Sequence, residues 1–305
     1  MNRLFAHPRV RIIPPSTLGG VFFMFKKFAS PLASALLLVA TLTPQPAMAA
    51  ATPSRIISLS PSATEILFGI GAGSQVVAVD DNSDFPLSAP FSKLSSFTPN
   101  VEAIAAYHPD LVVLQSTATN AATIQSDLQK LKIKVFLEVT PTNIAQAYSE
   151  FLALGKVTGH PSRAIALVAT MKSQIAEIIT RAKKKSPITF FHELDNTLYS
   201  ADSSTFIGQI YSDFNLSNIA DTANAGGYPQ LSAEAVIKAN PKLIFLDDAP
   251  YGESAATVAT RPGWSAISAV KTKHVLALPL DIPDRWGPRL VDFYRYIAQA
   301  ISKVN

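Results

Sequence analysis

Short apolar runs recur along the chain, and segments with helical spacing separate them. In the first half the runs are Arg55–Leu59, Val76–Val79, Leu111–Leu114 and Lys134–Val139. Their length and their content of Val, Ile and Leu are typical of buried strands. Because helical segments lie between them, the pattern predicts a parallel sheet.

The first predicted strand leads directly into a predicted helix. Ser62 has the position of a helix N-cap, and Glu65 follows three residues later, which is the capping-box pattern. We expect a helix over 63–70 that ends in the run of alternating glycines. These glycines do not form the dinucleotide-binding fingerprint, because Ser74 stands at its third glycine position and because they close a helix instead of opening one. They indicate a helix C-cap and a turn.

Segment 161–185 has a long, unbroken helical pattern. Pro161 suits the first turn of a helix, apolar residues recur at helical spacing from Ala164 to Ile179, and nothing interrupts the pattern before Pro187. A helix of roughly 24 residues is about 36 Å long. This length favours a strut that joins two lobes. An ordinary amphipathic helix packed on one sheet is the alternative.

The strand–helix pattern restarts after this segment. Predicted strands cover Ile188–His192, Lys242–Leu246 and His274–Leu278, and a last helix covers about Val291–Val304. The second half also contains an echo of the first. Residues 102–114 read EAIAAYHPDLVVL and residues 234–246 read EAVIKANPKLIFL, with glutamate, alanine, proline and two leucines at the same offsets. The echo predicts two related lobes, each with a helix, a proline turn and a buried strand.

The N-terminus has the pattern of an export signal. Lys26 and Lys27 precede an apolar stretch over 32–42, which is too short to span a bilayer comfortably, and Ala47–Ala49 has the small-x-small pattern of a cleavage site. We therefore expect a signal peptide over 1–49 with cleavage near Ala49, and a periplasmic or secreted product. A membrane anchor is the alternative. Met24 is a second candidate start, because a signal of ordinary length begins there.

Charge and cysteine content exclude several classes of protein. Of 26 basic residues five lie in segment 1–49, which has no acidic residue, so 21 remain against 22 acidic residues. The remainder is near neutral, and we expect no nucleic-acid partner. The chain has no cysteine. This excludes disulfides, thiolate metal sites and a lipid anchor on a cysteine at the cleavage site.

The opening RIISLSPSATEILFGIGAGSQVVAVDDNSDFP resembles that of periplasmic binding proteins for cobalamin, ferric siderophores and haem. Further markers are PNVEAIAAYHPDLVV, GYPQLSAEAVIKANPKLIF, RPGW and RWGPRLVDF, so the resemblance extends over 54–303. It implies an α/β fold of class III, with two Rossmann-like lobes joined by a single long backbone α-helix. The expected divisions are an N-terminal lobe over 54–158, a linking helix over 161–185 and a C-terminal lobe over 187–305.

The resemblance also implies a ligand cleft between the lobes, lined by residues that follow strand ends. Phe97 and Tyr228 stand at aromatic positions of the family, and flat aromatic rings fit the face of a corrin or porphyrin. Arg285 could contact a carboxylate, phosphate or amide of the ligand. Asn82 and Gln115 depart from the cobalamin binder, which has aromatic residues there. The expected ligand-binding residues are Ser60, Pro61, Ser62, Asn82, Phe97, His192, Glu193, Tyr199, Tyr228, Arg285 and Trp286.

Two glutamates are candidates for docking to a transporter. In the family, the residues at the positions of Glu102 and Glu234 lie on the exposed tip of each lobe and pair with permease arginines. Each is also explained as an acidic residue favoured at a helix start. His192 and Glu193 follow a predicted strand, and a hydrogen-bonding role for His192 is favoured over metal chelation. The scattered histidines give no set of converging ligands, so no resident metal or cofactor is expected.

The sequence thus favours a monomeric substrate-binding protein that delivers a metal chelate to an ABC permease dimer with its ATPase. A corrinoid ranks first as the ligand, a ferric siderophore second and haem third. No serine-hydrolase elbow is present, and we expect no enzyme. The alternatives are a secreted α/β enzyme that uses Glu193 or His192, and a stand-alone sensor or scavenger of haem or metal.

Overall fold

The computed structural model describes residues 52–279 and 281–304. The predicted signal over 1–49 and its cleavage site near Ala49 lie outside the described residues. Within those ranges, no helix combines the length and the apolar character that a membrane crossing requires.

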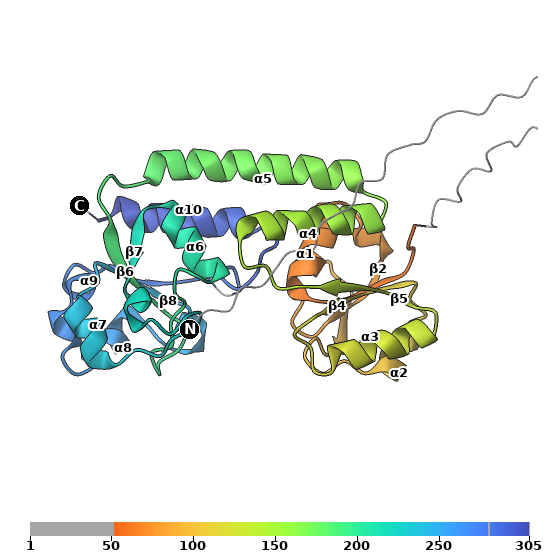
Figure 1. The fold of residues 1–305 in the computed structure, drawn as a ribbon, viewed down its shortest axis with the longest axis horizontal. Coiled ribbons are helices and arrows are strands. Elements are labelled where there is room, and N and C mark those ends of the chain that lie inside the picture. Colours follow the sequence, from red (N-terminus) through yellow and green to blue (C-terminus); the bar gives the residue numbers. More distant parts are fainter. Residues whose placement is uncertain (1–51, 280, 305) are drawn as a thin grey trace, which may run out of the picture. The chain divides into compact units, whose positions relative to one another are not determined.

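The first lobe contains a five-stranded parallel sheet with the order β3-β2-β1-β4-β5. Figure 1 shows this lobe in orange to yellow-green and labels β2, β4 and β5. Four of its strands confirm the sequence prediction to within one or two residues. β3 was not predicted, because its four residues alternate between exposed and buried and it lies at the sheet edge, where Phe91 is exposed. The strands are β1 (Ile56–Leu59), β2 (Val76–Asp80), β3 (Phe91–Leu94), β4 (Leu111–Gln115) and β5 (Lys134–Glu138).

Helices cover both faces of this sheet, and the alternation of strand side chains explains why. Ile56 of β1 belongs to the hydrophobic cluster that contains residues of α1 and α4, whereas Ile57 and Leu59 belong to the cluster that contains residues of α2 and α3. Both faces are apolar, as a parallel sheet between helices requires. The helices are α1 (Pro61–Gly69), α2 (Val101–Ala105), α3 (Ala121–Lys130) and α4 (Ile144–Val157).

The start of α1 corrects one prediction. The N-cap is Ser60, whose side chain accepts a hydrogen bond from the backbone N–H of Ala63 at 3.2 Å, and not Ser62. Pro61 occupies the first helical position, where its fixed φ is favourable and its missing N–H costs nothing, so the helix begins two residues earlier than expected. Glu65 forms no capping box and instead pairs with Arg289.

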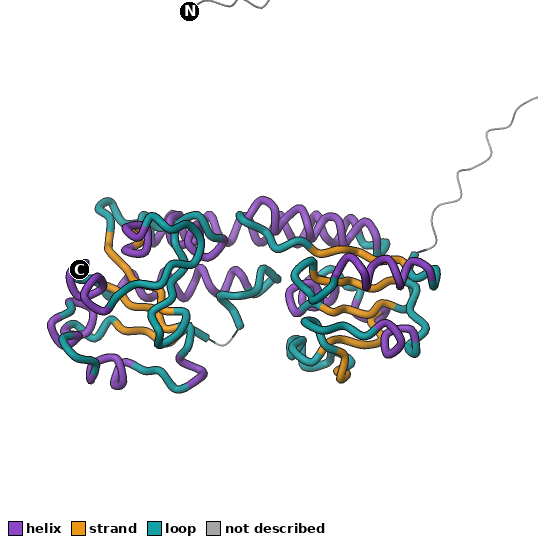
Figure 2. Tube along the Cα trace, turned by 60° about the horizontal axis from the view of Figure 1, so that its bottom comes forward, coloured by secondary structure: helices purple, strands orange, loops and turns teal. Residues whose placement is uncertain are grey.

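The second lobe contains a four-stranded parallel sheet with the order β7-β6-β8-β9; Figure 2 shows its strands side by side. Three strands confirm the prediction, and β7 was not predicted because its sequence, Leu-Ser-Asn, contains no apolar run. The strands are β6 (Ile188–Glu193), β7 (Leu216–Asn218), β8 (Leu243–Leu246) and β9 (Val275–Ala277). The helices of this lobe are α6 (Phe206–Asp213), α7 (Ala233–Ala239), α8 (Ala255–Thr260) and α9 (Ser268–Lys271).

The long helix α5 covers Pro161–Ala182. It ends three residues before the predicted boundary because the backbone of Lys183 is no longer helical. α5 packs on α4 and on the last helix, α10 (Leu290–Ser302), as Figure 1 shows. The buried stripe of α5 belongs to a cluster that includes residues of both sheets, so α5 is not a helix packed on one sheet alone. The two lobes and their long connecting helix form the predicted fold class.

The sequence echo corresponds to matching structure in the two lobes. In the first copy α2 precedes β4, and in the second α7 precedes β8. Each helix has a polar N-cap, Asn100 in one and Ser232 in the other, that accepts a hydrogen bond from the third backbone N–H of the helix. Glu102 and Glu234 follow in the first helical turn.

Candidate functional site

A cavity of about 400 Å³ lies where the chain segments after β5 and before α6 meet the loop before α10. We refer to that last segment, residues 281–289, as the 281–289 loop. The cavity has room for part of a large ligand or for a small one. Its lining residues are Thr140, Pro141, Thr142, Ser204, Thr205, Phe206, Ile207, Gly227, Tyr228, Pro283, Asp284 and Trp286.

The lining combines three aromatic rings, those of Phe206, Tyr228 and Trp286, with several hydroxyl groups and one carboxyl group. No Lys, Arg or His lines this cavity among the described residues. Burial and the neighbouring charge of Asp247 raise the pKa of Asp284 to about 7. The cavity wall therefore offers hydrogen-bond acceptors, hydroxyls and aromatic faces, and it offers no positive charge to an anionic ligand.

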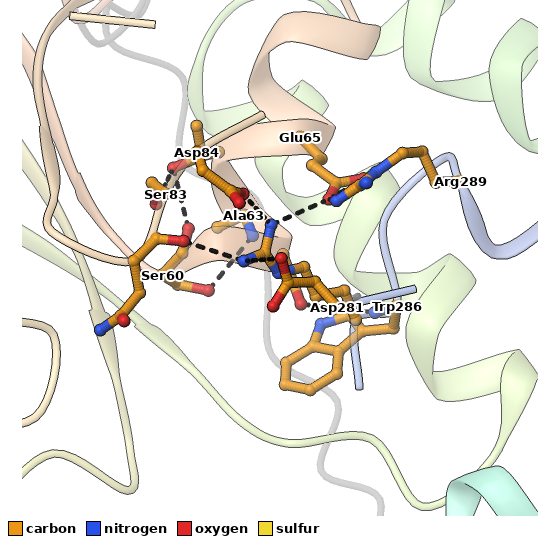
Figure 3. Close-up of polar contacts among 12 residues, drawn as sticks. Ser60, Ala63, Glu65, Ser83, Asp84, Asp281, Trp286 and Arg289 are labelled. Atoms are coloured by element: carbon orange, nitrogen blue, oxygen red, sulfur yellow. Dashed lines mark hydrogen bonds and ion pairs between the residues drawn. The ribbon is translucent and has the colours of Figure 1, made fainter. Parts of the chain in front are cut away.

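Arg285 lies beside the cavity lining but its guanidinium is committed to protein carboxylates. It donates to Asp84 at 2.6 Å and to the backbone oxygen of Asn82 at 2.9 Å, and it lies 3.2 Å from Asp281. Figure 3 labels the partners Asp84 and Asp281. The Glu65 carboxylate is 3.6 Å away. Burial works against ionisation of Asp84, but the hydrogen bond and charge of Arg285 hold the pKa of Asp84 below its usual value.

This arrangement fixes the 281–289 loop to the first lobe. Arg289 contributes a second contact by donating Nε–H and Nη2–H to Glu65 at 3.0 and 2.5 Å. Trp286 contributes a third contact, because its backbone N–H donates to the Ser62 hydroxyl at 3.3 Å. Arg285 is thus 8% exposed and surrounded by acids, so the structure gives it a positioning contact and not a free charge in the cavity.

His192 and Glu193, two of the predicted cleft residues, are the last two residues of β6 and are fully buried inside the second lobe. Because successive strand residues alternate between faces, His192 lies under α6, where its Nδ1 is 2.9 Å from the Tyr211 hydroxyl. Glu193 accepts two hydrogen bonds from Arg261, at 2.6 and 2.5 Å. The expectation that these two side chains face a cleft is therefore wrong for this structure.

Comparison with known proteins places the chain in a family. A family model described as periplasmic binding protein matches residues 56–281. The chain belongs to the periplasmic binding protein family. An uncharacterized ABC transporter substrate-binding lipoprotein of Bacillus subtilis is 32% identical over 259 residues, which cover 82% of this chain and 80% of that protein.

Two further relatives of this periplasmic binding protein are similar over nearly their whole length. The vitamin B12-binding protein of Yersinia pestis is 29% identical over 91% of this chain and 95% of that protein. The crystal structure of a possible iron-binding periplasmic solute-binding protein from Staphylococcus epidermidis has a TM-score of 0.73 and 26% identity. The match covers 82% of this chain and 99% of that one.

The structure brings two of the predicted ligand residues, Tyr228 and Trp286, into the lining of one cavity. Ser60, Pro61 and Ser62 form the start of α1, and the hydroxyls of both serines are engaged in protein hydrogen bonds. The remaining predicted residues do not line this cavity. Asn82 and Tyr199 are exposed, and Phe97 is 61% exposed after β3, so their ligand roles stay predictions.

Sequence reasoning missed most of the polar residues of the binding protein's cavity. Thr140 and Thr142 follow the end of β5, a place where the rule about strand ends could have indicated them. Asp284 directly precedes Arg285, the first residue of the motif RWGPRLVDF. Ser204 and Thr205 gave no signal, because a serine or threonine before a helix is explained by capping alone, and Thr205 is indeed the N-cap of α6.

Proposed function

We propose that this chain is the substrate-binding component of an ABC importer and that it captures a bulky metal chelate of the corrinoid type. Family membership and the similarity to a substrate-binding lipoprotein support the transport role. A B12-binding relative that matches over most of both chains supports the ligand class. A ferric siderophore ranks second and haem third.

The observation that carries the ligand proposal is the charge of the cavity wall. Haem presents carboxylates, and many siderophores present carboxylates or catecholates, which bind best to Arg or Lys. The wall offers hydroxyls and the carboxyl group of Asp284, and Arg285 is held by three acidic residues. Corrins carry amide side chains, whose N–H groups can donate to these oxygens, and a macrocycle that can stack on Tyr228 and Trp286.

Isothermal titration calorimetry with cyanocobalamin, haemin and ferric citrate tests this proposal. We expect cyanocobalamin to bind most tightly, and Tyr228→Ala to weaken its binding by about 1–3 kcal/mol through loss of a buried aromatic contact. Tyr251→Ala is the matched control, because Tyr251 is 83% exposed and does not line the cavity. Tighter binding of haemin than of cyanocobalamin would overturn the corrinoid assignment. Unchanged affinity of Tyr228→Ala would remove Tyr228 from the site.

We further propose that Glu102 and Glu234 dock the protein to a permease dimer. Both side chains are exposed in the first turns of α2 and α7. Backbone hydrogen bonding at the helix start and Ser232 hold the pKa of Glu234 below its usual value. Two separated carboxylates can orient the protein on a receptor made of two similar subunits.

Charge reversal tests docking separately from ligand capture. The double variant Glu102→Lys and Glu234→Lys should bind cyanocobalamin normally but lose most uptake in proteoliposomes with the cognate permease, because like charges would meet permease arginines at both lobes. Glu177→Lys is the control, since Glu177 is an exposed glutamate on α5. Normal uptake by the double variant would refute the docking role. If the protein binds its ligand but supports no uptake through a permease, a stand-alone scavenger would be favoured.

We also propose that the protein is exported and that segment 1–49 is removed near Ala49. The substrate-binding relatives support an extracytoplasmic location. N-terminal sequencing of secreted or periplasmic material should begin near Ala50, and an intact N-terminus held in the membrane would contradict the proposal. A secreted enzyme that uses His192 or Glu193 is disfavoured, because both side chains are fully buried.

A further inference from the structure

Two glutamates, Glu138 and Glu150, lie buried together behind the cavity residue Trp286. Glu138 is the last residue of β5 and Glu150 lies on α4; they are 2% and 8% exposed. The indole N–H of Trp286 donates to Oε2 of Glu150 at 2.7 Å. Both oxygens of Glu138 and Oε1 of Glu150 are buried and have no other hydrogen-bond partner among the described residues.

The surroundings of this pair do not compensate two negative charges. Ser60, before α1, and Trp286, in the 281–289 loop, lie near Glu138 without a hydrogen bond to it, while Asp80 at the end of β2 adds a further acid. Glu150 faces Glu138 and Trp286. In the described part of the chain no Lys, Arg or His forms an ion pair with either carboxyl group.

Two buried carboxyl groups without a cation cannot both be ionised, so they must hold at least one proton between them. Burial and the neighbouring Glu138 raise the pKa of Glu150 to about 10, and burial raises the pKa of Glu138 as well. A protonated Glu150 can accept the indole N–H with one oxygen and donate its own proton toward Glu138 with the other. This accounts for two of the three unpartnered oxygens, Oε1 of Glu150 and one oxygen of Glu138.

We propose that Glu150 is a positioning residue for Trp286: a proton shared with Glu138 keeps its carboxyl group neutral, and this neutral group fixes the indole in the wall of the ligand cavity. The proposal rests on the proposed function only in that the cavity holds the ligand. Loss of the proton at alkaline pH would place two charges in contact behind the cavity. The repulsion would displace Glu150 or the 281–289 loop, and with it the aromatic wall.

Fluorine NMR of protein labelled with 5-fluorotryptophan tests this without any ligand. The chain has two tryptophans, and Trp264 is buried in the core of the second lobe, so it serves as an internal control of folding. Trp286→Phe assigns the two resonances. We expect the Trp286 resonance to move at alkaline pH, near the pKa of about 10, while that of Trp264 stays.

Three variants of the pair separate the possible roles. Glu150→Gln is a neutral isostere that can still accept from Trp286 and donate to Glu138, so the Trp286 resonance at pH 7 should match the original protein and lose its alkaline transition. Glu150→Leu can do neither, and the resonance should shift. In Glu138→Gln the transition should move to lower pH, because the neighbouring charge is gone.

Binding of cyanocobalamin links the positioning role to the site. We expect Glu150→Leu to weaken binding by about tenfold, the effect of one lost orienting hydrogen bond, and Glu150→Gln to restore it. A Trp286 resonance that shifts as much in Glu150→Gln as in Glu150→Leu at pH 7 would overturn the proposal. If the fluorine results hold but no variant binds cyanocobalamin, the positioning role stands and the proposed ligand fails.

Discussion

In each lobe one parallel strand ends in a buried glutamate, but the two glutamates have different partners. Glu138 ends β5 in the first lobe and Glu193 ends β6 in the second; they are 2% and 0% exposed. Glu138 faces another carboxyl group, that of Glu150. Glu193 faces the guanidinium of Arg261, which also reaches Glu253 at 2.9 Å.

The difference shows that the partner, and not the position in the fold, decides what a buried carboxyl group does. Burial raises the pKa of both glutamates. In the second lobe Arg261 opposes this shift and provides two charge-assisted hydrogen bonds, which makes a fixed structural contact. In the first lobe no cation opposes it, so the pair keeps a proton and can respond to pH.

The largest expected loss of stability comes from breaking the Glu193–Arg261 contact. Arg261→Met would leave Glu193 buried without its cation, and we expect the free energy of unfolding to fall by about 3–5 kcal/mol. Urea denaturation at pH 7 measures this change. Arg181→Met is the control, because Arg181 pairs with Glu177 on the exposed surface of α5, and its loss should cost less than about 1 kcal/mol. Equal costs for both variants would remove the distinction between the lobes.

The next effect is on the pH dependence of stability, which the first-lobe pair should dominate. The folded pKa of Glu150, about 10, lies above its ordinary value of 4.5, so the folded protein keeps a proton that the unfolded chain releases. The resulting stabilisation is complete below pH 4.5 and decreases as the pH rises toward 10, by about 1.4 kcal/mol per pH unit for one proton.

Denaturation curves at pH 6 and pH 8 measure this slope. Burial also raises the pKa of Asp284 and Asp248 to about 7. Both groups therefore also lower the free energy of unfolding as the pH rises, up to about pH 7. Glu150→Gln retains these two groups. The variant should reduce the decrease of the free energy of unfolding with pH by up to about 1.4 kcal/mol per pH unit, the contribution of one proton. An identical slope in the variant would mean that Glu150 is already ionised in the folded protein, and the contrast with Glu193 would disappear.

The smallest effect concerns a feature that the lobes share. Asn100 caps α2 through a 2.8 Å hydrogen bond, and Ser232 caps α7 through one of 3.1 Å. We expect Asn100→Ala and Ser232→Ala each to lower the free energy of unfolding by about 1 kcal/mol, because each leaves one helical N–H without its acceptor. Thermal unfolding followed by circular dichroism provides the comparison. A large cost in one lobe and none in the other would show that the two copies are not energetically equivalent.

The amino-acid sequence determined the elements that depend on local pattern. Hydrophobic runs located the central strands, and helical spacing located α5 and α10. It also showed the repeated helix–turn–strand unit, and a family resemblance supplied the fold. Two edge strands, β3 and β7, were not predicted because polar residues interrupt their apolar positions and leave no hydrophobic run. The start of α1 was misplaced because serines at 60 and 62 are both good caps, and only the position of Pro61 distinguishes them.

Only the tertiary structure decided how the candidate site residues are used. Arg285 was recognised from its motif, but its carboxylate partner Asp84 lies 201 residues away in the sequence. Trp286 and Glu150 are likewise 136 residues apart. Local periodicity indicates which face of an element is buried, but it contains no information about which distant polar groups meet there. Because a buried charge is controlled by those long-range neighbours, the protonation of Glu138 and Glu150 and the neutralisation of Arg285 follow from the folded contacts alone.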